Sequence, residues 1–243
     1  MEIAGTTALV TGAGRGLGAA TARMLAARGA KVAALDREAP VAPEGGMSLT
    51  ADVTDEAGVE RAVAECVDAL GPPRIVVNCA GIAPAARMVG REGRTSLDLF
   101  RQVIGVNLIG TYTVMTYAAR AMMAAGQGGV IVNTASAAYQ DGQVGQSAYA
   151  ASKGAVASMC LPLAREMARS GIRVCAIAPG LFRTPMMEAL PEETVAGIEG
   201  TIPYPARLGH PDEFALLACQ IAENDYLNGE VIRLDGATRL PPR

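Results

Sequence analysis

The chain has 243 residues, of which 50% are hydrophobic and 19% charged, as is typical of one globular domain with a large core. The formal net charge of -3 argues against nucleic acid as a partner, and no apolar run of about 18 residues predicts a membrane span. The odd number of cysteines, five, favours reduced thiols, and a single histidine with scattered cysteines offers no set of ligands for a metal site. We expect a cytoplasmic protein without a metal that acts on a small molecule.

Short runs rich in Val and Ile alternate along the chain with longer runs of helical periodicity. The predicted strands are 7–10, 31–35, 47–51, 74–78, 129–134, 173–177 and 231–234. The predicted helices are 18–28, 56–70, 97–124, 149–170 and 211–223. This alternation predicts an α/β fold with a doubly wound, Rossmann-type parallel sheet in a single domain.

Within that domain we expect a nucleotide-binding half at about 1–95 and a catalytic and substrate half at about 96–243. The segment 184–210 has many prolines and no strand pattern, which predicts a lid with a short helix. Met186, Met187 and Leu190 in this lid are candidates to cover a substrate chain.

A glycine-rich turn follows the first predicted strand at residues 11–18. Its glycines Gly12, Gly16 and Gly18 allow a tight turn and a close approach to a pyrophosphate, which the next helix would face with its free N–H groups. Such a turn is weak evidence alone, but its place between a strand and a helix predicts nucleotide binding.

The second predicted strand is followed by Asp36, where a carboxylate can accept hydrogen bonds from the adenosine ribose and repel a 2′-phosphate. Arg15 and Arg37 could instead serve a 2′-phosphate. The acidic residue at the strand end favours NAD over NADP. Asp52 with Val53, and the run 79–81, follow the next two strands and are further candidates to line the cofactor.

Tyr149 and Lys153 are four residues apart on a predicted helix and therefore share a face. A nearby ammonium favours the phenolate and lowers the pKa of a tyrosine, which makes it a usable general acid and base. Ser136 follows the fifth predicted strand, where its hydroxyl can hold a substrate oxygen. Asn107, a polar residue inside a long helix, indicates a hydrogen bond that is either structural or catalytic.

These residues together resemble the pattern of the short-chain dehydrogenase/reductase family over nearly the whole chain. The matching features are residues 11–18, Asn78 with Ala80 and Gly81, Asn107, Ser136, Tyr149, Lys153, Pro179 and Gly180. The resemblance implies that Tyr149 is the acid and base and that Lys153 binds the nicotinamide ribose and tunes Tyr149. It also implies that Ser136 orients the substrate oxygen and that Asn107 anchors a proton-relaying water.

Within that family, the runs 142–146, 161–165, 178–182 and 228–237 resemble the type 2 3-hydroxyacyl-CoA dehydrogenases. This implies NAD-dependent oxidation of a short or branched 3-hydroxyacyl-CoA in fatty acid metabolism by a homotetramer. The implied substrate contacts are Ser136, Gln143 and Tyr149. The implied cofactor contacts are Gly12, Arg15, Gly16, Leu17, Gly18, Asp36, Asp52, Val53, Cys79, Ala80, Gly81, Tyr149, Lys153, Pro179, Phe182 and Thr184.

Three departures from the resemblance bear on specificity. Cys79 stands where the wider family has asparagine, Arg37 stands where the closer relatives have an apolar residue, and the segment 87–96 is shorter and more basic. Arg87, Arg91, Arg94 and Arg207 are candidates to bind the CoA phosphates.

Alternatives to this function are an NADPH-dependent 3-oxoacyl-carrier-protein reductase, a hydroxysteroid dehydrogenase and a non-catalytic scaffold subunit. Asp36 argues against the reductase, and the set Ser136, Tyr149 and Lys153 argues against loss of catalysis. A tetramer is also favoured by apolar residues on more than one face of the helices 97–124 and 149–170. These residues are Met115, Tyr117, Met122, Met159 and Leu163.

Overall fold

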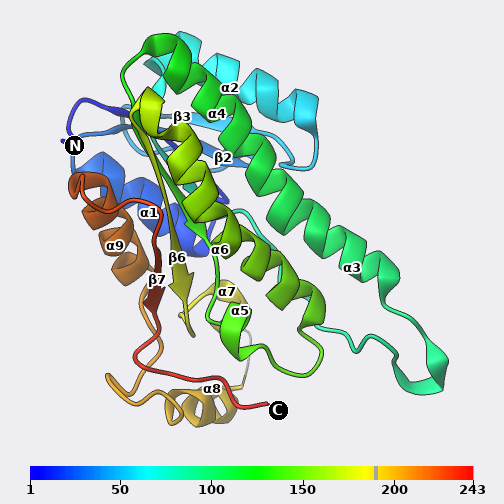
Figure 1. Cartoon of the computed structure of the whole chain (residues 1–243). Helices are drawn as coiled ribbons and strands as arrows, with labels where there is room; N and C mark the ends of the chain where they lie inside the picture. The colour runs from blue at the N-terminus through cyan, green and yellow to red at the C-terminus, as the bar shows by residue number, and fades with distance from the viewer. Residues whose placement is uncertain (189–190, 243) are drawn as a thin grey trace.

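The structure, a computed structural model, describes residues 1–188 and 191–242. Its centre is a seven-stranded parallel sheet with the strand order β3-β2-β1-β4-β5-β6-β7 (Figure 1). The chain moves outward in one direction from β1 to β3 and then returns to add β4 on the other side of β1. This confirms the predicted doubly wound α/β fold and places the switch point between β1 and β4.

The strands and helices lie close to their predicted positions. The strands are β1 (Thr7–Thr11), β2 (Lys31–Asp36), β3 (Met47–Thr50), β4 (Pro73–Asn78), β5 (Gly129–Thr134), β6 (Ile172–Pro179) and β7 (Val231–Leu234). The helices are α1 (Gly16–Ala27), α2 (Glu56–Leu70), α3 (Leu97–Ile104), α4 (Thr111–Ala125), α5 (Ala138–Asp141), α6 (Ser147–Met167), α7 (Pro185–Glu188), α8 (Glu192–Glu199) and α9 (Pro211–Glu223).

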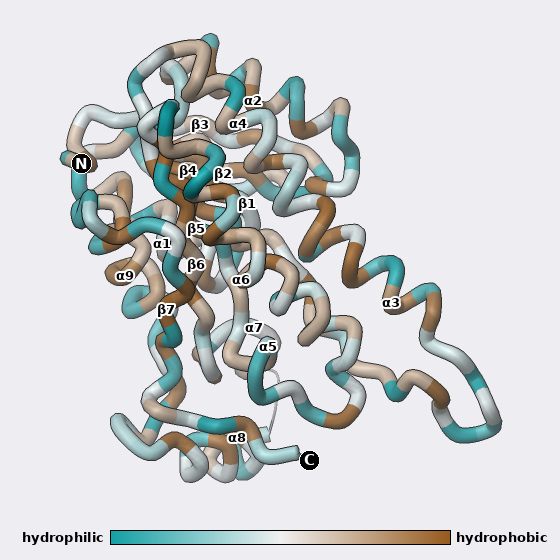
Figure 2. The backbone as a smooth tube through the Cα atoms, in the orientation of Figure 1, coloured by the Kyte–Doolittle hydropathy of each residue, from teal (hydrophilic) through white to brown (hydrophobic). Residues whose placement is uncertain are grey.

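Helices cover both faces of the sheet and divide the core in two. Helices α1 and α9 pack together on one face, and α2, α4 and α6 cover the other (Figure 1). The central strands are almost wholly buried, and their middle residues are apolar, which colours parts of the sheet brown (Figure 2). Burial on both faces explains why these strands show continuous apolar runs and no alternation.

The predicted helix 97–124 is divided in the structure. A π-helical turn, η2 (Gly105–Gly110), separates α3 from α4. A Cβ atom at Gly110 would lie 2.6 Å from Val53 Cγ2, so the absent side chain lets this turn approach the loop after β3. The periodicity of apolar residues predicts the helix but does not show this local change of pitch.

Two other expectations, one about the buried side of α4 and one about the lid, were wrong. Met115 and Met122, expected on an outward face, are 4% and 1% exposed and belong to the core. The lid contains two helices, α7 and α8, where one short helix was expected. Leu190 and the side chain of Met186, named as possible chain-covering residues, lie outside the described part of the structure.

The five cysteines are free thiols, and four of them are buried, in agreement with the sequence. Across residues 1–188 and 191–242, the structure shows no helix that is long and apolar enough to cross a membrane. The same residues contain no cluster of three or more His, Cys, Asp or Glu side chains suited to a metal.

Candidate active site

The glycine-rich turn lies between β1 and α1 at the carboxyl edge of the sheet. Gly12 has a φ of 64°, and a Cβ atom there would lie 2.7 Å from the Ala80 nitrogen. A Cβ atom at Gly18 would overlap the Gly12 carbonyl oxygen. The first turn of α1 has no side-chain cap and no acidic residue, so its N–H groups are available to an anion. These features fit the pyrophosphate of a dinucleotide.

Asp36, at the end of β2, reaches this glycine turn. Its Oδ2 accepts a hydrogen bond from the Gly14 nitrogen at 2.8 Å, and its Oδ1 accepts one from the Arg37 nitrogen at 2.7 Å. The carboxylate therefore lies where an adenosine ribose would follow the pyrophosphate. Arg15 and Arg37 are exposed at the same edge.

Thr11 joins the ends of β1 and β4, a role that was not predicted from the sequence. Its Oγ1 accepts hydrogen bonds from the backbone nitrogens of Cys79 and Ala80 at 3.1 and 3.2 Å. The run 79–81 is thereby held against the glycine turn. The sequence feature that could have indicated this role is a threonine at the end of an otherwise apolar strand.

The residues after β3 are also at this edge. The carboxylate of Asp52 accepts hydrogen bonds from the Thr54 nitrogen and hydroxyl, which lower the pKa of Asp52. Val53 is 7% exposed and packs against the π-helical turn at Gly110. The loop after β3 is thus fixed next to the helix that carries Asn107.

Lys153 is buried in the middle of the site, with 4% of its surface exposed. Its Nζ donates a hydrogen bond to the Thr134 carbonyl oxygen at 2.7 Å and lies 5.8 Å from the centre of the Tyr149 ring. Burial lowers the pKa of Lys153 to about 8 because the protein interior disfavours the ammonium. The hydrogen bond from Lys153 to the Thr134 carbonyl was, like the role of Thr11, not indicated by the sequence.

Tyr149 and Ser136 lie together at this edge. Burial raises the pKa of Tyr149, and a hydrogen bond with the Ser136 hydroxyl opposes that rise. We expected Lys153 to lower this pKa, but in the protein without its cofactor the burial effect is larger. The shift toward the phenolate that the sequence predicted is therefore not seen in the protein alone.

Asn107 is completely buried, and its amide makes structural hydrogen bonds. Its Oδ1 accepts from the Ile82 nitrogen at 2.8 Å, and its Nδ2 donates to the Ile82 carbonyl oxygen at 2.9 Å and to Ser152 Oγ at 3.1 Å. A Cβ atom at Gly81 would lie 3.3 Å from Asn107 Oδ1 and 3.6 Å from Lys153 Nζ. The π-helical turn thus brings Asn107 beside the lysine.

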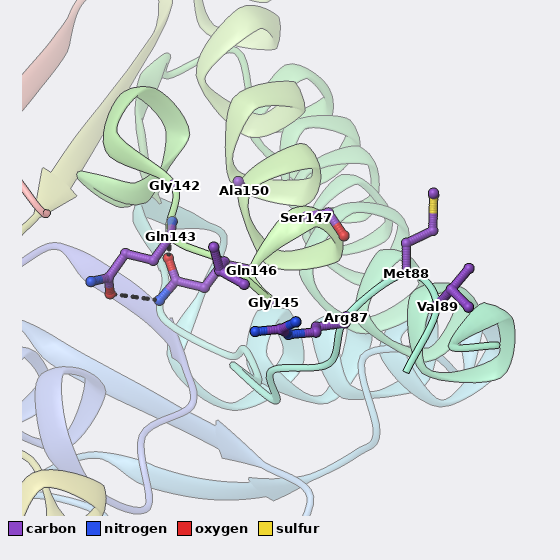
Figure 3. A pocket seen from close by; sticks show the side chains of 10 residues that line it. Arg87, Met88, Val89, Gly142, Gln143, Gly145, Gln146, Ser147 and Ala150 are labelled. Atoms are coloured by element: carbon purple, nitrogen blue, oxygen red, sulfur yellow. Dashed lines mark hydrogen bonds between the residues drawn. The ribbon is translucent and has the colours of Figure 1, made fainter. Parts of the chain in front are cut away.

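A cavity of about 570 Å³ lies between the β4–α3 connection and the loop 142–147. Figure 3 shows Arg87 pointing from that connection toward the loop, on which Gln143 and Gln146 are hydrogen-bonded to each other. The cavity also reaches Ala150, in the first turn of α6, next in sequence to Tyr149.

Four further predicted cofactor residues lie near the same edge. Thr184 Cγ2 would be 3.8 Å from a Cβ atom at Gly16, and Pro179 ends β6. Phe182 is 7% exposed and packs in the core against Gly209, and Leu17 packs against the same cluster of apolar side chains. Phe182 and Leu17 thus support the site from the core side.

The lid connects to the core through charged side chains. Arg207 makes a two-pronged ion pair with Glu213, at 2.8 Å for each oxygen, which corrects the expectation that Arg207 is available to a phosphate. Arg183 lies 3.3 Å from Glu199 of α8. Met187 and Val195 line a smaller cavity of about 320 Å³ beneath the lid.

Comparison with known proteins agrees with this arrangement. Residues 6–194 match the sequence model of the family described as short chain dehydrogenase. The chain is 46% identical to 3-hydroxyacyl-CoA dehydrogenase type-2 of Drosophila melanogaster and 45% identical to that of Homo sapiens, covering 99% of this chain and 100% and 98% of theirs. The crystal structure of 3-hydroxyacyl-CoA dehydrogenase type-2 from Mycobacterium avium is similar, with a TM-score of 0.92, 39% identity and 98% of each chain covered.

Proposed function

This chain belongs to the short-chain dehydrogenase family, and we propose that it oxidises a short or branched 3-hydroxyacyl-CoA to the 3-oxoacyl-CoA with NAD. The observation that carries the proposal is the joint placement of Ser136, Tyr149 and Lys153 at the edge that also holds the glycine turn. The names of the similar proteins support the acyl-CoA substrate.

The choice of NAD rests on Asp36. Its carboxylate braces the glycine turn through Gly14 and carries a negative charge where NADP has its 2′-phosphate. Two unit charges about 4 Å apart repel by roughly 4 kcal/mol at an effective dielectric constant near 20. That repulsion exceeds the attraction that the exposed side chains of Arg15 and Arg37 are expected to provide to a 2′-phosphate.

When bound, NAD supplies the acceptor for the hydride of the substrate carbon. Tyr149 takes the proton of the substrate hydroxyl, and Ser136 holds that oxygen in line. Lys153, fixed by the Thr134 carbonyl, holds the ribose and favours the phenolate form of Tyr149. Asn107, which lies near Lys153 in the π-helical turn, would anchor a water that relays protons to Lys153.

The cavity at the loop 142–147 suits the CoA part of the substrate. Gln143 lines it from the substrate side, and Arg87 adds a cation that makes no ion pair within the described residues. Arg94, by contrast, is 84% exposed and lies 3.6 Å from Glu92. Of the four candidate arginines, Arg87 is the one that lines this cavity, so we assign Arg87 to the CoA phosphates.

Several broader properties belong to the same proposal. The enzyme acts in fatty acid metabolism in the cytoplasm, with residues 1–95 forming the nucleotide half, 96–243 the catalytic half and 184–210 the lid. It forms a homotetramer, because Ile109, Tyr112, Met123 and Leu161 of the turn η2 and helices α4 and α6 are 47–57% exposed.

The test is the steady-state rate with NAD and with NADP on 3-hydroxybutyryl-CoA, on a branched analogue and on a truncated thioester without phosphates. The wild-type enzyme should prefer NAD and the intact CoA thioesters. Arg87→Gln should raise KM for the CoA thioester, more at low than at high salt, because salt screens exposed charges. Arg94→Gln is the matched control and should leave KM unchanged.

Each alternative has its own outcome. Good activity on a steroid alcohol with none on any 3-hydroxyacyl-CoA would replace the substrate, and a preference for NADPH would favour the reductase. Equal rates on the intact and the truncated thioester would remove the role of Arg87 alone.

A further inference from the structure

The C-terminal residues 235–242, which we term the C-terminal strap, leave β7 and cross the end of the molecule that carries α5 and α8 (Figure 1). Chain ends usually fray unless specific contacts hold them. The strap contacts both the loop 142–147 and the C-terminal part of the lid near Tyr204. The proposed function gives no role to these contacts.

The first attachment is a cluster of buried charges. Arg233 of β7 binds Asp141 of α5 at 2.6 Å, donates to Asp235 Oδ2 at 2.7 Å and donates to the Thr238 carbonyl oxygen at 3.1 Å. The side chains of Arg233, Asp141 and Asp235 are 16%, 12% and 7% exposed. Charge-assisted bonds in such a setting fix geometry strongly, so α5 and the strap are tied to one guanidinium.

The second attachment holds the substrate-side loop itself. Gln143 Nε2 donates to the Pro241 carbonyl oxygen at 3.0 Å, and the Val144 nitrogen donates to the Pro242 carbonyl oxygen at 3.2 Å. Gln143 Oε1 accepts from Gln146 at 3.3 Å. Both ends of the Gln143 amide are therefore engaged, and one of the two partners is the strap.

The third attachment is to the returning end of the lid. The Tyr204 nitrogen donates to the Gly236 carbonyl oxygen at 3.3 Å. Gly236 has a φ of 59°, and a Cβ atom there would lie 2.8 Å from Ile202 Cγ2. The strap thus links the lid to the loop 142–147, the two segments that border the proposed substrate site.

We propose that the C-terminal strap is a positioning element for the acyl-CoA substrate, because it holds Gln143 and its loop in place before the substrate arrives. The inference rests on the proposed function for the identity of the substrate. None of the described hydrogen bonds of residues 235–242 reaches the glycine turn at residues 11–18, so we expect the strap to affect substrate binding more than cofactor binding.

Two variants test the strap at different points. Asp141→Asn keeps the shape of the side chain and removes the charge that Arg233 binds, and a chain that ends at Leu240 removes both carbonyl acceptors of the loop. The controls are Asp98→Asn, which makes the same change in a fully exposed ion pair, and removal of Arg243 alone. The readouts are KM, kcat, NAD affinity and amide hydrogen exchange at residues 138–147.

Both variants should raise KM for 3-hydroxybutyryl-CoA about tenfold, the effect of losing one or two net hydrogen bonds. Exchange at residues 138–147 should quicken, while kcat stays within about threefold and NAD affinity is unchanged, as expected for lost ground-state positioning. Both controls should match the wild type.

Unchanged KM with unchanged exchange would overturn the inference, and so would an equal loss of NAD affinity, which would indicate general loosening. Failure of the proposed function looks different. The wild-type enzyme would then be inactive on acyl-CoA, while the exchange readout, and KM for whichever secondary alcohol it does oxidise, would still decide the role of the strap.

Discussion

At the scale of single residues, the environment of Tyr149 governs the chemistry. Burial raises its pKa, and only the Ser136 hydroxyl opposes that effect in the protein alone. A tyrosine in this state holds its proton near neutral pH, so in the proposed reaction we expect the positive charge of the bound cofactor to favour its ionisation. The spacing to Lys153 identifies the pair in the sequence, but the desolvation that raises the pKa of Tyr149 depends on the surrounding fold.

Tyr149→Phe should lower kcat at least about 100-fold, the usual effect of losing a general acid and base. NAD affinity should remain close to that of the wild type, because the phenol makes no part of the glycine turn. Stopped-flow turnover and NAD titration on the folded variant measure the two effects. Near-normal turnover would show that another group moves the proton.

Asp36→Ala should increase the use of NADP relative to NAD. The carboxylate that repels the 2′-phosphate is removed, and Arg15 and Arg37 are then free to bind the added phosphate. The ratio of kcat/KM for the two cofactors measures the change. A wild-type enzyme that already prefers NADP would contradict the assignment.

At the scale of elements, the sequence predicts strands and regular helices better than their interruptions. Strand β5 and helices α2 and α9 lie where the apolar pattern placed them. The π-helical turn was not predicted, and its close approach to Val53 at Gly110 involves a distant part of the chain that local periodicity does not reflect. The short helix α5 was missed as well, because it is held by Arg233 of β7.

The junction of β1 and α1 gives a prediction at this scale. Gly18→Ala should destabilise the protein and weaken NAD binding, because the new methyl group would overlap the Gly12 carbonyl and force the turn open. Thermal unfolding and NAD titration measure both effects.

The control for this variant is Gly197→Ala in α8, where a Cβ atom would meet no other atom within 4 Å. It should be neutral or stabilising, because alanine favours a helix over glycine by about 1 kcal/mol. Equal behaviour of the two variants would show that the close approach at Gly18 has no importance.

At the scale of the whole molecule, the fold class could be predicted from the apolar pattern. Several candidate site residues could be named because they follow a strand end, whereas Tyr149 and Lys153 were named from their spacing on a helix. A parallel sheet brings strand ends to one edge, so Asp36 and Ser136 lie at the same edge of the sheet, although they are far apart in sequence and lie at the ends of strands three positions apart. The C-terminal strap could not be predicted, because its contacts to Gln143 depend on two loops that carry no periodic pattern.

The assembly is predicted from the exposed apolar residues of the turn η2 and helices α4 and α6. Light scattering at micromolar concentration should give a mass four times the 24.9 kDa of one chain. Leu161→Glu, at a position 47% exposed in the single chain, should shift the mass to smaller species without unfolding the subunit. A stable wild-type monomer would rule out this assembly.

The buried Lys153 affects both catalysis and the thermodynamic stability of the fold. The pKa of Lys153 falls from 10.5 to about 8 on folding. Below pH 8 the folded and unfolded chains both carry this proton, and the native state holds a poorly hydrated cation. Between pH 8 and 10.5 only the unfolded chain still binds it, so the contribution of Lys153 to the free energy of unfolding rises with pH.

Lys153→Met should therefore abolish activity and yet make the cofactor-free protein more stable at pH 7, by an amount on the order of 3 kcal/mol at most. Its advantage over the wild type should shrink as the pH rises from 8 to 10.5. Denaturant unfolding of both proteins across that range measures the difference, and an advantage that grew with pH would contradict the explanation. The cation that the reaction needs therefore lowers the free energy of unfolding of the cofactor-free enzyme at neutral pH. Because dinucleotide would bind only the folded chain, a high concentration of it in the cell would raise that free energy and protect the enzyme from unfolding.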